Sequence, residues 1–383
     1  MPKIDEYFDR VIESGASDLH LSVGVPVRIR VHGDLQPITD EELTAAHAAE
    51  LIGEILTDAQ REHFEKTRDL DLAYALGDRA RFRVNVFEQH RGLGAVMRLI
   101  PSKILSVEQL GLPQTILNFC GLYKGLVLVT GATGSGKSTT LAAMIDYINR
   151  TEKQHILTVE DPVEFVHPDK GCLVNQREVG HHTQTFATAL RAALREDPDV
   201  ILVGEMRDLE TIELAITAAE TGHLVFGTLH TTSAGKTMDR IINVFPTSQQ
   251  EQIRAMLAES LQGVVCQYLL KKADGKGRVA ALEVLVGTSA VSSLIREGKT
   301  YQIPSVLQTG RKLGMQTMDQ ALATLVLQKK VTMEAAQGCA TSKDALERAL
   351  QGADPVPAGP PGAGGAGLAS KDPALARARM GGK

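Results

Sequence analysis

Cysteine is scarce in this chain, and the four that occur are scattered. Cys120, Cys172, Cys266 and Cys339 lie dozens of residues apart. A zinc site usually needs CxxC-type pairs, and a disulfide-stapled fold needs a much higher density of cysteine. The spacing argues against both, and we expect four reduced thiols.

Aromatic residues are also few. They make up 4% of the chain with no tryptophan, and the formal net charge is −5 without a run of lysine and arginine. Such a chain offers few platforms for stacking bases and no basic footprint for a phosphate backbone. Composition therefore disfavours nucleic acid as a partner, and we expect the partners to be protein and nucleotide.

Long apolar runs are missing as well. No stretch approaches 18 consecutive apolar residues, and the N-terminus is acidic without an apolar segment. The hydrophobic content of 43% with 23% charged residues is typical of a globular protein, and a length of 383 residues predicts two domains. We expect a cytoplasmic protein that does not span a membrane.

The N-terminal region shows the pattern of a small α/β unit. Apolar and polar residues alternate over 27–31 and 80–86, which predicts half-buried strands, and 95–100 is a further candidate strand. Residues 40–66 have helical spacing. We predict an antiparallel α/β domain over residues 1–100 and a linker over 101–112.

The remainder of the chain reads differently. Short apolar runs alternate with helical stretches, which is typical of a buried parallel sheet; the runs are Leu126–Val129, Ile156–Val159, Val200–Val203 and Leu224–Phe226. Residues 285–350 are expected to be mostly helical, with Met315 and Met318 on a buried face, so the second domain spans 113–350. In the tail, 351–383, 21 of 33 residues are Gly, Pro or Ala, and we expect disorder there.

One motif carries most of the chemistry. The segment 131–139 consists of Gly131, Ala132, Thr133, Gly134, Ser135, Gly136, Lys137, Ser138 and Thr139, and its first eight residues fit GxxxxGK[ST]. It follows a predicted strand and precedes a predicted helix, which is the context that gives this motif meaning. Such a loop wraps its backbone amides around phosphates, while Lys137 reaches the β- and γ-phosphates and Ser138 ligates Mg²⁺. We therefore predict a P-loop that binds ATP and Mg²⁺.

Acidic residues follow the next two predicted strands. Glu160, Asp161 and Glu164 come after one, and Glu205 and Asp208 come after another. Because ligands of open parallel sheets bind beyond the carboxyl ends of strands, these side chains should face the P-loop. Gly204 stands where the usual Walker-B pattern has an aspartate. We therefore expect Glu205 to act on the attacking water without that neighbour, and Glu160 or Asp161 to join the Mg²⁺ shell through water. The competing interpretation is that these acids are solvated or cap helices.

Two histidines and three arginines are further candidates. His223 and His230 bracket a predicted strand and are suited to sense phosphate or to contact a neighbouring site, although a lone histidine is more often structural. Arg81 and Arg83 share one face of a strand, and Arg98 lies on the next candidate strand. A basic sheet face is usually just solvated, but arginines of this kind can also reach a phosphate in a neighbouring subunit.

Together these segments resemble the secretion-ATPase superfamily, and most closely the type IV pilus retraction ATPase family called PilT. The resemblance covers about residues 1–350. It depends on several ordered motifs: Ser17-Asp18-Leu19-His20, Arg81-Phe82-Arg83-Val84-Asn85, the P-loop, Glu160-Asp161-Pro162-Val163-Glu164-Phe165, the segment 190–199, Val203-Gly204-Glu205-Met206-Arg207-Asp208, and the box around His223 and His230.

The resemblance implies an α/β fold with a PAS-like N-terminal domain and a RecA-like ATPase domain, assembled as a homohexameric ring. It implies ATP bound between the domains, Glu205 as catalytic carboxylate, arginines 81, 83 and 98 at the nucleotide, and histidines that couple hydrolysis to domain rotation. The work would be pilus retraction and twitching motility, driven from the cytoplasmic face of the inner membrane through a platform protein.

Two alternatives stay open within this resemblance. Pilus-assembly and type II secretion ATPases usually carry an extra N-terminal domain and a tetracysteine insert, neither of which this sequence shows. Ser292 and Ser293 stand where the family usually has Arg-Asn. That difference favours an accessory retraction paralogue with low turnover that works beside another motor.

Overall fold

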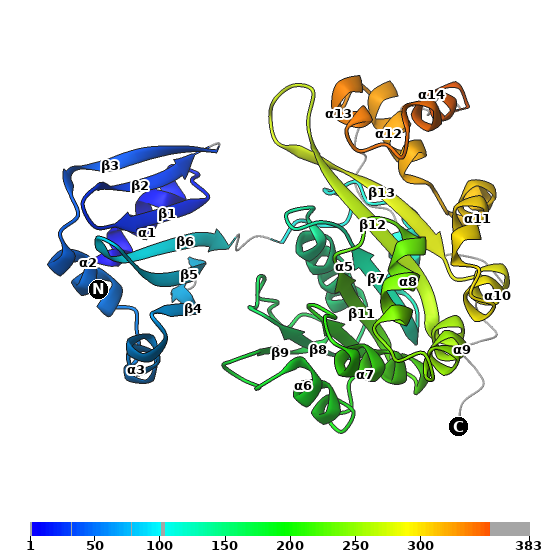
Figure 1. The fold of residues 1–383 in the computed structure, drawn as a ribbon, viewed down its shortest axis with the longest axis horizontal. Coiled ribbons are helices and arrows are strands. Elements are labelled where there is room, and N and C mark those ends of the chain that lie inside the picture. The colour runs from blue at the N-terminus through cyan, green and yellow to red at the C-terminus, as the bar shows by residue number, and fades with distance from the viewer. Residues whose placement is uncertain (1, 32, 78, 101–103, 353–383) are drawn as a thin grey trace.

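The computed structural model describes residues 2–31, 33–77, 79–100 and 104–352, and within them it forms two β-sheets (Figure 1). The first has six strands in the order β3-β2-β1-β6-β5-β4, all antiparallel. Its strands are β1 (Asp18–Ser22), β2 (Pro26–Val31), β3 (Asp34–Glu42), β4 (Asp69–Leu76), β5 (Ala80–Gln89) and β6 (Gly92–Ile100). The predicted strands at 27–31, 80–86 and 95–100 are confirmed.

Helices cover one face of this sheet. Phe8 of α1 (Ile4–Glu13) is fully buried and stacks on Phe82 of β5, with ring centroids 4.1 Å apart. Leu51 of α2 (Ala45–Gly53) joins the same core. Because side chains alternate along a strand, burying Phe82 on this face turns Arg81 and Arg83 to the other.

The prediction that residues 40–66 are helical is wrong in part, because they do not form one continuous helix. Residues 40–42 belong to β3, and the remainder forms α2 and α3 (Asp58–Thr67). Thr44 and Thr57 accept hydrogen bonds from the backbones of His47 and Gln60, so each begins a new helix as an N-cap. Apolar spacing alone does not reveal these caps.

The second sheet has seven strands in the order β13-β12-β7-β11-β10-β8-β9. Its strands are β7 (Gly125–Thr130), β8 (His155–Glu160), β9 (Leu173–Glu178), β10 (Val200–Val203), β11 (Leu224–Leu229), β12 (Leu261–Lys271) and β13 (Arg278–Val286). All neighbours are parallel except the β12–β13 hairpin. The prediction of a buried parallel sheet from the four apolar runs is confirmed.

Helices pack on both faces of this sheet. The helices α4 (Gln114–Cys120) and α5 (Lys137–Thr151) contribute to the core on one face. On the other face lie α7 (Leu209–Glu220), α8 (Ala234–Asn243) and α9 (Gln250–Ser260), while α6 (Phe186–Ala193) packs near β8. This arrangement brings the carboxyl ends of the parallel strands to one edge, facing the first sheet (Figure 1).

The C-terminal part is helical, as expected, with two exceptions. The helices are α10 (Ser289–Arg296), α11 (Ile303–Thr309), α12 (Met318–Leu327), α13 (Met333–Gln337) and α14 (Lys343–Gln351), with short 3₁₀ turns at Thr300–Gln302 and Gly310–Leu313. Strand β13 continues to Val286, and Met315 lies outside any helix because Gln316 bridges to Val284. Met315 is nevertheless buried.

Several expectations concern the boundaries of the chain's parts. The division into 1–100 and 113–350 stays a prediction. Residues 101–103 of the expected linker, and all but the first two residues of the expected disordered tail, lie outside the described residues. Among the described helices, none has the length and apolar character needed to cross a bilayer.

Candidate active site

The P-loop connects strand β7 to helix α5. Gly131, Gly134 and Gly136 have φ angles of 146°, 77° and 90°, a region that side chains with a Cβ rarely adopt. A Cβ on Gly131 would also lie 2.4 Å from the backbone oxygen of Gln267. Glycine is therefore needed here both for the turn and for the close approach of β12.

Lys137 lies over the loop that precedes it. Its Nζ donates hydrogen bonds to the carbonyl oxygens of Gly131 at 2.9 Å and Ala132 at 3.2 Å. Burial lowers the pKa of Lys137, while Glu205 and Glu164 act in the opposite direction. These acids place negative charge beside the ammonium group.

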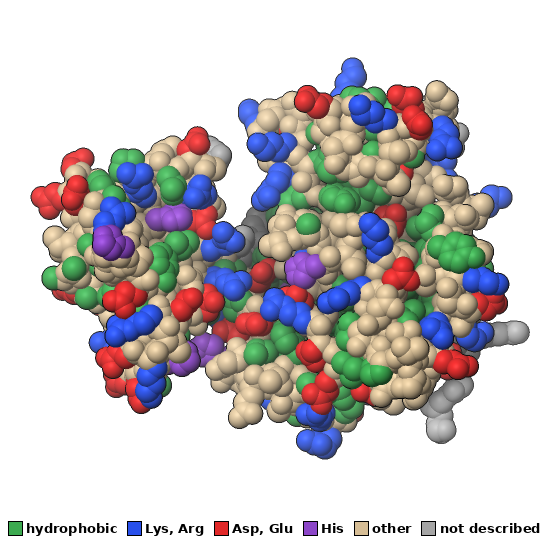
Figure 2. All heavy atoms as spheres, in the orientation of Figure 1, with side chains coloured by type: hydrophobic (Ala, Val, Ile, Leu, Met, Phe, Trp, Pro, Cys, Tyr) green, Lys and Arg blue, Asp and Glu red, His purple; other side chains and the backbone are tan. Residues whose placement is uncertain are grey.

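A cleft of about 1360 Å³ lies between the two sheets and collects most of the predicted site residues. Figure 2 shows this hollow between the smaller N-terminal part and the larger part, with acidic and basic side chains around it. The predicted residues that line the cleft are Thr133, Gly134, Gly136, Lys137, Ser138, Thr139, Glu160, Asp161, Glu164, Glu205, His230, Arg83 and Arg98. Gly131, Ala132, Ser135, Arg81 and His223 are not among the lining residues.

Glu205 follows strand β10 and is held by two basic partners. Arg207 forms a fork with it, with Nε 2.6 Å from Oε1 and Nη2 2.6 Å from Oε2. His230, just after β11, places its Nε2 2.9 Å from the same Oε1. Burial raises the pKa of Glu205, but Arg207 and His230 lower it more, so the net pKa lies below the usual value. Glu205 is therefore a carboxylate at neutral pH.

The glycine before Glu205 has a steric explanation. An added Cβ on Gly204 would lie 3.1 Å from both the Cα of Glu160 and the carbonyl oxygen of Val159. The backbone nitrogen of Gly204 also donates to that oxygen at 2.8 Å. Strand β8 therefore lies in tight contact with this position, and a side chain here would require β8 to shift by a few tenths of an ångström.

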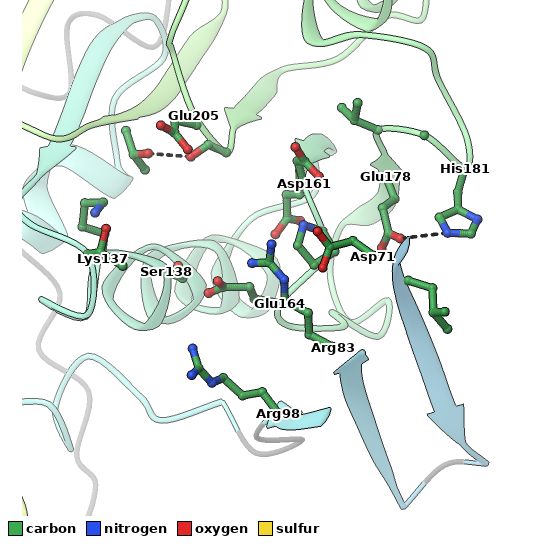
Figure 3. Close-up of a pocket in the computed structure, with 18 of the residues that line it drawn as sticks. Asp71, Arg83, Arg98, Lys137, Ser138, Asp161, Glu164, Glu178, His181 and Glu205 are labelled. Atoms are coloured by element: carbon green, nitrogen blue, oxygen red, sulfur yellow. Dashed lines mark hydrogen bonds and ion pairs between the residues drawn. The ribbon is translucent and has the colours of Figure 1, made fainter. Parts of the chain in front are cut away.

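The acidic box begins at the end of β8. The Oε1 of Glu160 accepts hydrogen bonds from Thr158 Oγ1 at 2.7 Å and Gln176 Nε2 at 3.2 Å. Burial raises the pKa of Glu160 to about 7, despite the lowering effect of these hydrogen bonds. Asp161 and Glu164 lie with it in the cleft (Figure 3).

Arginines from the first sheet reach the same cleft. Arg83 and Arg98 are register partners on β5 and β6, and Figure 3 shows both side chains directed into the cleft, with Arg83 toward Asp161 and Glu164. The Nε of Arg98 donates to Asp18 Oδ1 at 2.8 Å. This part of the chain thus supplies positive charge opposite the acids of the parallel sheet.

Arg81 makes a different contact. Its Nη2 lies 3.8 Å from Glu178 Oε2 on strand β9, so it links the two sheets without lining the cleft. The same Glu178 oxygen accepts a hydrogen bond from the backbone nitrogen of Val163 in the acidic box at 3.0 Å. His181 Nε2 is 3.6 Å from the other oxygen of Glu178 (Figure 3).

Two candidates lie outside this constellation. His223 precedes β11, at the opposite end of the strand from His230, and its Nδ1 lies 2.9 Å from the carbonyl oxygen of Ala218. It therefore does not line the cleft of its own chain. The expectation that the two histidines sense phosphate or contact a neighbouring site stays a prediction. Asp208 accepts from the backbone of Thr211 as the N-cap of α7, as the helix-cap interpretation holds.

Sequence reasoning gave no role to several residues at the site. Some of them form hydrogen bonds that hold other site residues, namely Arg207, Glu178 and Gln267. Others line the cleft, namely Asp71 and Arg278. Only Arg207 is a neighbour in sequence of a predicted residue. The one other signal is that Gln267 is a lone polar residue between apolar neighbours in Val264–Leu270.

The oxygen donors of the cleft fit Mg²⁺. Among the described residues, no cluster of three or more His, Cys, Asp or Glu side chains is placed to hold a metal on its own. Mg²⁺ at nucleotide sites usually keeps several waters and takes one or two protein oxygens together with phosphates. The Ser138 hydroxyl and the carboxylates of Glu160 and Asp161 are ligands of that kind.

Comparisons with known proteins agree with this geometry. A family model described as "Type II/IV secretion system protein" matches residues 1–353. The type IV pilus retraction ATPase PilT of Pseudomonas aeruginosa is 57% identical over 325 residues, covering 85% of this chain and 94% of the relative. The type IV pilus ATPase PilU of the same organism is 40% identical over 336 residues, covering 88% of each.

A solved structure is also similar. The crystal structure of the pilus retraction motor PilT with bound ADP superimposes with a TM-score of 0.84 at 47% identity, covering 91% of this chain and 99% of that one. The chain therefore belongs to the type II/IV secretion system protein family and, within it, to the PilT-type ATPases.

Proposed function

We propose that this chain hydrolyses ATP as one subunit of a homohexameric ring and that hydrolysis powers type IV pilus retraction. The observation that carries the proposal is the shared cleft. It brings the P-loop, Glu205 and Arg83 together from two different sheets. The identity with PilT over most of both chains supports the choice of retraction as the work performed.

The side chains have distinct tasks in this proposal. The P-loop amides and Lys137 hold the phosphates, and Glu205, ionised and fixed by Arg207 and His230, orients or deprotonates the attacking water. When bound, Mg²⁺ neutralises charge on the β- and γ-phosphates. Ser138 would hold it directly, and Glu160 or Asp161 would hold it through water.

The N-terminal sheet supplies the link to mechanical work. Arg83 and Arg98 face the cleft from a part of the chain that is joined to the parallel sheet through residues 101–112. In a ring, the same arginines are also candidates to reach a neighbour's nucleotide, and His223 at the far end of β11 is a candidate to contact a neighbour. Nucleotide turnover would then move residues 1–100 against 113–350.

Membership of the family supports a proposed setting at the membrane. The ring would act at the cytoplasmic face of the inner membrane on a platform protein of the pilus machine, without nucleic acid.

An accessory paralogue with low turnover is the second candidate function. It is favoured by Ser292 and Ser293, which stand where the family usually has Arg-Asn. The Ser292 hydroxyl donates to the carbonyl oxygen of Ala258 in α9 at 2.7 Å, and Ser293 is exposed on α10. The higher identity to PilT than to PilU favours the motor itself.

Lys137→Ala tests the nucleotide assignment. Removing the ammonium group from the phosphate site should abolish ATP hydrolysis, measured as phosphate release by the purified protein. Lys343→Ala, on the exposed side of α14, is the control and should leave the rate unchanged. Normal turnover in Lys137→Ala would contradict the assignment.

A further inference from the structure

Gln267 lies directly behind the P-loop although it is far from it in sequence. Strand β12 runs parallel to β7, with Cys266 paired to Thr130, so Gln267 comes beside Gly131 where the loop begins. The side chain is 3% exposed. It is a single polar side chain at the place where the loop turns toward its ligand.

Both polar atoms of the Gln267 side-chain amide form hydrogen bonds. Its Nε2 donates to the carbonyl oxygen of Ser135 at 2.7 Å, and its Oε1 accepts from Thr140 Oγ1 at 2.8 Å. The Thr140 hydroxyl therefore orients the amide so that its nitrogen faces the loop. Both partners are buried as well, with Ser135 at 5% and Thr140 at 2% exposure.

The bond to Ser135 fixes the orientation of one peptide group. In a planar trans peptide the carbonyl and the next N–H point in opposite directions. Holding the Ser135 carbonyl toward Gln267 thus turns the N–H of Gly136 away from β12, to the side where the loop binds phosphate. A donor already aimed at an anion needs no reorganisation when the anion arrives.

The tight packing leaves little room for another arrangement. A Cβ on Gly136 would lie 2.8 Å from Gln267 Nε2, so the amide is in close contact with the loop itself. Rotating the Ser135–Gly136 peptide would leave two buried polar groups without partners, which is costly.

We propose that Gln267 is a positioning residue that pre-organises the phosphate-binding amides of the P-loop through Ser135, with Thr140 setting the orientation of its amide. This inference depends on the proposed nucleotide site. The ligand class is the phosphate chain of a nucleoside di- or triphosphate.

The test replaces Gln267 by a side chain of similar shape without hydrogen bonds. Gln267→Met should weaken ADP binding about tenfold in a calorimetric titration, which is the scale expected when a buried hydrogen-bonded network is broken. The P-loop amides hold the phosphates in the substrate and in the transition state alike. The KM for ATP should therefore rise by a similar factor, while kcat changes less than about twofold.

Gln316→Met is the matched control. Its Nε2 donates to the carbonyl oxygen of Leu282 at 2.7 Å, in the same sheet but outside the P-loop. This variant loses a half-buried hydrogen bond from a glutamine amide to a backbone carbonyl and should bind ADP as the wild type does. If Gln267→Met does not fold, Thr140→Val removes the orienting hydroxyl and should weaken ADP binding about threefold.

The outcomes separate this inference from the proposed function. Wild-type protein that binds no ADP would contradict the proposed function itself. Wild-type protein that binds ADP, together with unchanged affinity in Gln267→Met or, if that variant does not fold, in Thr140→Val, would overturn only the positioning role. Equal losses in Gln267→Met and Gln316→Met would also overturn it, because affinity would then follow general loosening of the sheet.

Discussion

Gly204 offers a sharp test of how tightly the active-site strands pack. Gly204→Ala adds one methyl group 3.1 Å from the Cα of Glu160 and the carbonyl oxygen of Val159. Both are backbone atoms of β8, which cannot rotate away as a side chain can. Strands β8 and β10 must therefore separate by a few tenths of an ångström.

The magnitude combines two opposing effects. Overpacking of a filled interior typically costs about 1–3 kcal/mol. Replacing glycine by alanine also restricts the unfolded chain, which offsets about 0.4–1 kcal/mol. We expect a net loss of about 1–2 kcal/mol in the free energy of unfolding, or a Tm lower by roughly 2–8 °C for a domain of this size.

The assay is thermal and urea unfolding of the variant beside a control. Gly121→Ala suits this purpose because Gly121 has a φ of −91° and its nearest atom to an added Cβ is 3.7 Å away. That control should be neutral or slightly stabilising. Equal stabilities of Gly204→Ala and Gly121→Ala would refute the packing argument for the missing aspartate.

Two further predictions concern charge in the cleft. Because burial raises the pKa of Glu160 from 4.5 to about 7, the folded state holds a proton that the unfolded state has released. Wild-type stability should therefore fall relative to Glu160→Gln as pH rises from about 5 to 8 in urea titrations, and a constant difference would contradict the pKa. If Arg83 acts across the ring, mixing Arg83→Ala subunits with Glu205→Gln subunits should restore ATP hydrolysis, because a neighbour's intact Arg83 then completes a site that still has Glu205. No recovery would place Arg83 at its own subunit's nucleotide.

The sequence predicted the parts of the site that are local. The P-loop motif, the preceding apolar strand and the following helix are contiguous, so Lys137 and Ser138 could be placed directly. The acids after β8 and β10 were found because parallel strands end at the same edge.

The remaining contacts join residues that are distant in the chain. Gln267 and Ser135 are separated by 132 positions, and Glu178 and Val163 by 15 across a loop. Periodicity says which face of a strand is buried, but it does not say which carbonyl a buried amide will meet. The split of 40–66 into two helices was missed for a related reason, because Thr57 caps α3 through a hydrogen bond that apolar spacing does not encode.

The most direct test of the account is steady-state ATP hydrolysis and mass by light scattering for the wild type and Glu205→Gln. The substitution keeps the shape of the side chain but removes the charge that meets Arg207 and His230. We predict a hexamer that hydrolyses ATP, and a Glu205→Gln hexamer that still binds ATP but hydrolyses it at least about a hundredfold more slowly. Unimpaired turnover in Glu205→Gln, or wild-type protein that is monomeric and inactive, would contradict the account.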